Sequence, residues 1–128
     1  MIYEDFYAQL GKLFYQIAAA DGKVAQAEKR VLHDLVRKNW EPLEATKDEY
    51  GSDQAGLIIA AFDYEESENE TIADLASFEA FYKDNKPGFT TQIKKNILQT
   101  SRAIAEAYRS KNHAEQKKLD LLKKIMDH

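Results

Sequence analysis

Cysteine is absent from this chain of 128 residues, and proline occurs only twice. Without a thiol, disulfides, thiolate zinc sites and cysteine nucleophiles are excluded. The longest uninterrupted apolar run covers residues 55–62, whereas a transmembrane helix needs ~20 such residues. We therefore expect no membrane span. The first residues lack the basic start and apolar run of a signal peptide, so the cytoplasm is the expected compartment.

Glycine is scarce as well, with five residues in the chain, and apolar side chains recur at spacings of three and four. Few helix breakers and this period together predict an all-α fold. The composition is 44% hydrophobic and 31% charged, with a formal net charge of -4. One globular domain over residues 1–128 is the expected organisation.

The apolar pattern and the turn residues divide the chain into about six expected helices. The first ends at Asp21-Gly22, the second covers residues 25–39, and the fifth is capped by Thr90 or Thr91. The third runs from a cap at Ser52 or Asp53 to residue 62, the fourth covers residues 72–82, and the last begins near residue 113. Residues 55–62 also fit a buried strand, but helix is preferred because no second strand is available to pair with it.

An internal repeat is indicated when residues 17–36 are aligned with residues 104–123, since seven of twenty positions are identical. Five of the seven are apolar positions that two amphipathic hairpins share anyway, so the Ala-Glu pair after an equal loop is the stronger part. We expect a compact bundle in which two helical hairpins are related by a pseudo-twofold axis. The identical pairs are Ile17 and Ile104, Ala18 and Ala105, Ala20 and Ala107, Ala27 and Ala114, Glu28 and Glu115, Leu32 and Leu119, and Leu35 and Leu122.

The loop after the first helix has an acidic pattern, Asp21-Gly22-Lys23-Val24 followed by Glu28. It matches the second half of an EF-hand loop, where glycine is at position six and glutamate at position twelve. Ile17 and Ala19 occupy the places of the first oxygen ligands, so a tight calcium cage is excluded. A weak divalent-cation site at Asp21 and Glu28, for an ion such as calcium, is one hypothesis. Helix capping is the other.

Residues 10–35, and above all Ala20-Asp21-Gly22 with Glu28, resemble the TerB-like family, which is named for tellurite-resistance proteins and shares its fold with the N-terminal region of the co-chaperone DjlA. The resemblance implies an all-helical domain that carries this motif twice, with acidic residues proposed to bind a divalent cation. Asp21 and Glu28 carry over from the first motif and Glu115 from the second. Tyr108 and Arg109 depart from the motif, which argues against a symmetric metal site.

Charge is strongly segregated along the chain. Residues 41–79 hold twelve acidic side chains against one lysine, a balance of -11, whereas residues 80–128 hold eleven basic side chains against five acidic ones, a balance of +6. The densest acidic cluster follows Tyr64 in a predicted turn and could attract a basic partner. A solvated loop, or compensation by Lys94, Lys95, Lys117 and Lys118, would also explain it. The candidate partner-binding residues are Glu65, Glu66, Glu68 and Glu70.

No catalytic motif is present, and His33, His113 and His128 lack the spacing of metal ligands. The basic residues of the second half are spread around their helices without aromatic platforms, so we expect no nucleic-acid binding. The expected function is a non-enzymatic TerB-like interaction or adaptor module, linked to stress or tellurite resistance through the resemblance and requiring no cofactor. The alternatives are weak calcium binding and a small-molecule enzyme.

Overall fold

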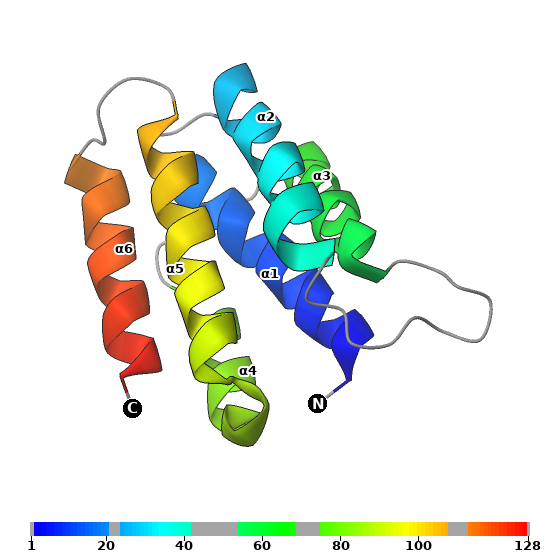
Figure 1. Ribbon diagram of the computed structural model, residues 1–128. Coiled ribbons are helices and arrows are strands. Elements are labelled where there is room, and N and C mark those ends of the chain that lie inside the picture. Colours follow the sequence, from blue (N-terminus) through cyan, green and yellow to red (C-terminus); the bar gives the residue numbers. More distant parts are fainter. Residues whose placement is uncertain (1, 21–23, 42–53, 69–74, 108–112, 128) are drawn as a thin grey trace.

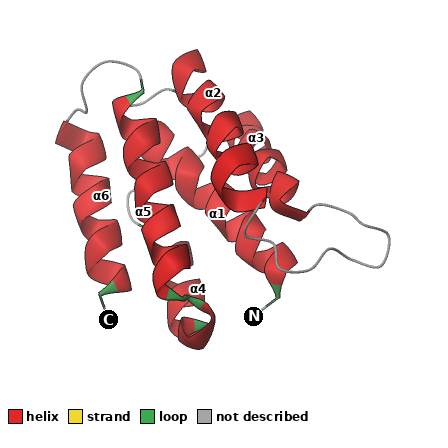
Figure 2. Cartoon of the chain, viewed as in Figure 1, coloured by secondary structure: helices red, strands yellow, loops and turns green. Residues whose placement is uncertain are grey.

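The computed structural model describes residues 2–20, 24–41, 54–68, 75–107 and 113–127 (Figure 1). They form an all-α bundle, as predicted, and no strand occurs among them (Figure 2). The main helices are α1 (Tyr3–Ala18), α2 (Gln26–Leu35), α3 (Leu57–Glu68), α4 (Ala76–Asp84), α5 (Thr91–Glu106) and α6 (His113–Met126). In these described ranges, no helix is both long and apolar enough to cross a membrane.

Helix α1 is the central helix of the bundle and contacts α3, α4, α5 and α6 (Figure 1). Its apolar residues recur at spacings of three and four, and Leu10, Phe14 and Ile17 are fully buried. Gly11 lies at the crossing with α3, where an added Cβ would meet the carbonyl oxygen of Ile58. The absence of a side chain at this position therefore lets the two helices approach closely.

Helix α2 continues into a π-helical turn, η1 (Val36–Trp40). The predicted extent of this helix is confirmed, but its last turn is not α-helical. Trp40 is 1% exposed and packs against Phe6 and Phe14. The turn therefore carries one of the largest side chains of the core.

Helix α3 follows a short 3-10 turn, η3 (Gln54–Gly56), and runs to Glu68. The strand alternative for residues 55–62 is therefore wrong. The expected end at residue 62 is also wrong, because residues 64–68 are helical and are not a turn. Phe62 packs edge-on against Tyr15 of α1 at a centroid distance of 5.8 Å. This contact lies on the interface that holds α3 against the centre of the bundle.

Helices α4, α5 and α6 pack on the other side of α1. Thr90 caps α5 by accepting a hydrogen bond from the backbone N–H of Ile93, as predicted. A 3-10 turn, η4 (Lys86–Gly88), joins α4 to α5. The hydroxyl of Tyr82 donates to the carbonyl of Met126 over 3.2 Å, which ties α4 to the end of α6. The predicted start of α4 at residue 72 lies outside the described residues.

The two segments of the predicted repeat lie in corresponding elements, the first in α1 and α2 and the second in α5 and α6. Ile17 and Ile104 are both fully buried, and Glu28 and Glu115 are both 3% exposed. α5 contacts α1, α2 and α6. These observations agree with a repeat, but amphipathic packing alone also buries such positions. The duplication and its pseudo-twofold axis stay predictions.

Candidate functional site

Glu28 acts as a capping residue in the first turn of α2. Its Oε1 accepts a hydrogen bond of 2.7 Å from the backbone N–H of Ala25, the N-cap residue. A complete capping box has two hydrogen bonds, one to the N-cap backbone and one to the N-cap side chain. Only the first forms here, because the side chain of alanine has no acceptor. The capping hypothesis for Glu28 is thus confirmed.

The cation hypothesis stays a prediction, because Asp21 lies outside the described residues. Within the described ranges, no group of three or more His, Asp or Glu side chains is arranged to hold a metal ion. Titration calorimetry with calcium, comparing the wild type with Asp21→Ala, tests the hypothesis directly. Equal heats of calcium binding for the two proteins would show that Asp21 forms no calcium site.

The predicted partner-binding carboxylates lie on the last turns of α3, apart from Glu70, which lies outside the described residues. Glu65 and Glu66 are half-buried, and Glu68 is exposed. Glu66 forms an ion pair of 2.7 Å with Lys29 of α2. The charge of Glu66 is therefore compensated by a lysine of α2, and not by the expected lysines of α5 and α6.

Tyr15 of α1 is 3% exposed and lies under the acidic end of α3. Burial raises the pKa of its phenol above the ordinary value of 10.0, and the negative charges of Glu66 and Glu65 raise it further. On the inner side of the α3 end, the neutral phenol of Tyr15 therefore lies beside carboxylates, and one of these, Glu66, is paired with a lysine.

The outer side of the same helix end is open to solvent. Tyr64 is 62% exposed, and Asp63, Ser67 and Glu68 are exposed around it. Ser67 donates a hydrogen bond of 2.7 Å to the carbonyl of Tyr64, one turn earlier in the helix. We use the name acidic α3 end for Asp63, Tyr64, Glu65, Glu66 and Glu68. It presents one large aromatic ring among carboxylates.

A shallow hollow of about 300 Å³ follows the neighbouring face of α2. It is lined by Gln26, Lys29, Arg30, His33 and Asp34, all on that one helix. Arg30 and Asp34 are both exposed on this face, and Lys29 is paired with Glu66. No second element contributes to the lining named here, so the hollow is the space between side chains of a single helix.

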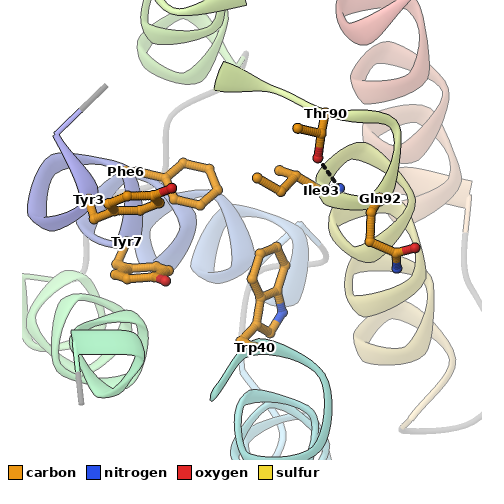
Figure 3. A pocket seen from close by; sticks show the side chains of 7 residues that line it. All are labelled: Tyr3, Phe6, Tyr7, Trp40, Thr90, Gln92 and Ile93. Carbon is orange, nitrogen blue, oxygen red and sulfur yellow. Dashed lines mark hydrogen bonds between the residues drawn. The ribbon is translucent and has the colours of Figure 1, made fainter. Parts of the chain in front are cut away.

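A second hollow, of about 200 Å³, lies between the start of α1, the end of η1 and the start of α5 (Figure 3). We call it the aromatic pocket. Four of its lining residues are aromatic. They come from segments far apart in the chain, so no pattern in the sequence indicates the pocket. It is lined by Tyr3, Phe6, Tyr7, Trp40, Thr90, Gln92 and Ile93.

Polar contacts with α5 fix the π-helical wall of this pocket. The indole N–H of Trp40 donates to the hydroxyl oxygen of Thr100 over 3.1 Å. The side-chain amide of Asn96 donates to the carbonyl of Asn39 over 3.0 Å and accepts from the Gln92 amide. Asn96 and Thr100 are buried polar residues on an apolar helix face, and this pattern is the sequence signal for the contact.

Comparison with known proteins identifies no relative: no family model matches the chain, and neither a curated protein nor a solved structure matches it.

Proposed function

We propose that this chain is a non-enzymatic, TerB-like interaction module whose acidic α3 end binds a basic segment of a protein partner. The observation that carries the proposal is Tyr64, a tyrosine that is 62% exposed among carboxylates. Tyrosine is enriched in the residues that dominate binding energy at protein interfaces, because it adds large area and a polar tip at low entropic cost.

The charge arrangement at the acidic α3 end supports a basic partner. Asp63 and Glu66, and Glu65 and Glu68, are like charges three residues apart on one helix, a spacing that places them side by side. Within the described residues, Glu65 and Glu68 form no ion pair with lysine or arginine. A partner that brings positive charge would relieve this repulsion, which amounts to a few tenths of a kcal/mol for each pair.

The neighbouring face of α2 limits where such a partner can dock. Arg30 of α2 and Arg37 and Lys38 of η1, which continues it, are exposed, and Lys29 already pairs with Glu66. A basic segment spreading over α2 would meet like charges. The proposed contact is therefore the outer side of α3 around Tyr64, away from α2. The suggested link to stress or tellurite resistance depends on the sequence resemblance alone.

The test measures binding of a lysine- and arginine-rich peptide by fluorescence anisotropy at several salt concentrations. We expect weak binding that falls with salt, because exposed charges are screened. Replacing Glu65, Glu68 and Glu70 together with glutamine should weaken it by about fivefold or more, since each exposed pair contributes up to ~1 kcal/mol. Tyr64→Ala should weaken it as well.

The matched control replaces Asp84, Asp120 and Asp127 with asparagine. These three exposed aspartates lie on or next to α4 and α6, so the control has the same net charge as the glutamine variant. We expect it to bind the peptide like the wild type. Equal losses in the two triple variants would mean that the peptide senses only total charge, and the proposal would be wrong.

A further inference from the structure

We propose that the outer face of α3 pairs with the same face of a second copy of this chain, with the two α3 helices antiparallel and crossing at Ala60. This inference deepens the proposed function and rests on it, because the acidic α3 end forms one half of the contact. It identifies the partner as a second copy. Its basis is a self-complementary arrangement of shape and charge along α3.

The first two turns of α3 are apolar on all sides. Residues 55–62 contain no polar side chain, although α3 lies on the outside of the bundle against α1 (Figure 1). Gly56 and Ala60 are exposed, and Leu57 is half-buried. A helix that is apolar all round is normally covered on all sides, and exposed apolar surface marks interaction sites. The outer face of α3 is therefore a surface that a partner would cover.

Gly56, Ala60 and Tyr64 lie on one stripe of this face, because residues four apart in a helix are neighbours. Tyr64 is 62% exposed, and nothing lies within 4 Å of a Cβ added at Gly56. Each of the two is four residues from Ala60, which is about 6 Å along the helix axis. A two-fold axis at Ala60 therefore places the ring of Tyr64 in the open space beside the partner's Gly56, and the reverse.

The charges at the two ends of α3 favour the antiparallel arrangement. After Tyr64 the helix carries Glu65 and Glu68, whereas its first turn has no acidic residue and its N-terminus adds about half a positive charge. At this N-terminal end η3 contacts η1, on which Arg37 and Lys38 are exposed. Antiparallel pairing brings the acidic end of each copy to the basic end of the other. Parallel pairing would bring the two acidic ends together, which like-charge repulsion opposes.

The size of the contact predicts a weak dimer. Two short helices that cross at an alanine bury less than the ~1,200 Å² at which stable interfaces begin. We therefore expect a reversible equilibrium with a dissociation constant of about 100 μM or above.

Sedimentation equilibrium of the whole chain, at concentrations up to ~1 mM, tests the pairing. Gly56→Gln fills the open space with a side chain, so this variant should stay monomeric throughout. Ala80→Gln makes the matched change at an exposed alanine of α4 and should dimerise like the wild type. Tyr64→Ala should weaken dimerisation by about tenfold or more, because the two-fold axis removes the ring from both halves of the contact. Circular dichroism checks that each variant is folded.

A charge variant separates this inference from the proposed function. Replacing Arg37 and Lys38 together with glutamine should weaken dimerisation by about fivefold or more, while the acidic α3 end still binds the basic peptide like the wild type. A wild type that stays monomeric but binds the peptide would overturn the second-copy proposal and leave the proposed function in place. A wild type that does neither would overturn both. Dimerisation that Gly56→Gln leaves intact, or that Ala80→Gln weakens equally, would also overturn the pairing at α3.

Discussion

At the scale of single residues, several polar groups in the described core are matched by a partner or act as a cap. The carboxylate of Glu28 is buried against the start of α2 and accepts from the backbone of Ala25. The indole of Trp40 reaches Thr100. Such pairing matters because an unmatched buried polar group costs about 1–3 kcal/mol. The surroundings of Tyr15 raise the pKa of its phenol.

The pH dependence of stability should show the raised pKa of Tyr15. Below pH 10 the phenol is neutral in both folded and unfolded chains. As the pH rises through this range, the unfolded chain ionises first while the folded protein retains the proton, so stability is lost. We expect Tyr15→Phe to lose less stability than the wild type as the pH rises above about 10, measured by urea unfolding at each pH.

The exposed tyrosine of α3 is the control for this measurement. Tyr64→Phe removes the hydroxyl of a side chain that is 62% exposed, so it matches the substitution without touching a buried group. If Tyr15→Phe and the wild type lost stability in parallel over this range, the burial of the phenol would not be coupled to folding.

At the scale of helices, α1 and α3 approach each other closely where they cross at Gly11. An added Cβ at this position would lie 2.6 Å from the Cβ of Ala61 and 2.9 Å from the backbone nitrogen of Phe62. It would also meet the carbonyl of Ile58. Backbone atoms cannot rotate away, so the two helices would have to separate.

Gly11→Ala should therefore lower the free energy of unfolding by about 1–3 kcal/mol, the usual cost of overpacking. The gain in helix propensity from glycine to alanine, about 1 kcal/mol, works in the opposite direction. Urea denaturation measures the net effect. Gly56→Ala is the control, since nothing lies within 4 Å of its added Cβ. If the Gly11→Ala protein were as stable as the wild type, the two helices would have room for the added methyl group at this crossing.

The helices themselves could be predicted from sequence, but their ends and partners could not. The spacing of apolar residues and the turn residues predict about six helices and a cap at Thr90 or Thr91. The described residues form six α-helices, and Thr90 is the cap. The charged run after Phe62 was interpreted as a turn because it lacks apolar residues. It stays helical in the structure, with Glu66 paired to Lys29 of α2. That ion pair joins two residues far apart in the chain, so the local spacing of apolar residues cannot predict it.

The aromatic pocket was not predictable for the same reason. Tyr3, Trp40 and Ile93 come from three segments separated by most of the chain. Each is explained locally as an apolar residue of a helix. Only the packing of α1, η1 and α5 brings them together. The buried Asn96 and Thr100 on α5 mark this contact, but sequence alone does not say which partner they bind.

At the scale of the whole molecule, the described helices share one apolar core that runs from α2 to α6. Leu122 of α6 is fully buried, and Trp40 lies on another side of the bundle. Because small domains unfold as one cooperative unit, a destabilising substitution in α6 should also shift the unfolding transition that is measured at Trp40.

Leu122→Ala should lower the free energy of unfolding by about 2–5 kcal/mol, the range for deleting a buried leucine side chain. The check compares two probes in one urea titration, Trp40 fluorescence and far-ultraviolet circular dichroism. We expect both to shift together to lower urea. If the dichroism transition split while the Trp40 midpoint stayed in place, α6 would unfold separately and the protein would not be one cooperative unit.

The π-helical turn changes how this chain tolerates insertions and deletions. A π turn bonds each residue to the fifth one along, so it holds one residue more than an α turn. Loss of one codon within residues 37–39 would leave an ordinary α turn with the tryptophan still directed toward α5. The same loss earlier in α2 would rotate every later side chain of that helix by about 100°. Within α2 and η1, the length of the polypeptide is therefore most freely adjustable beside the tryptophan.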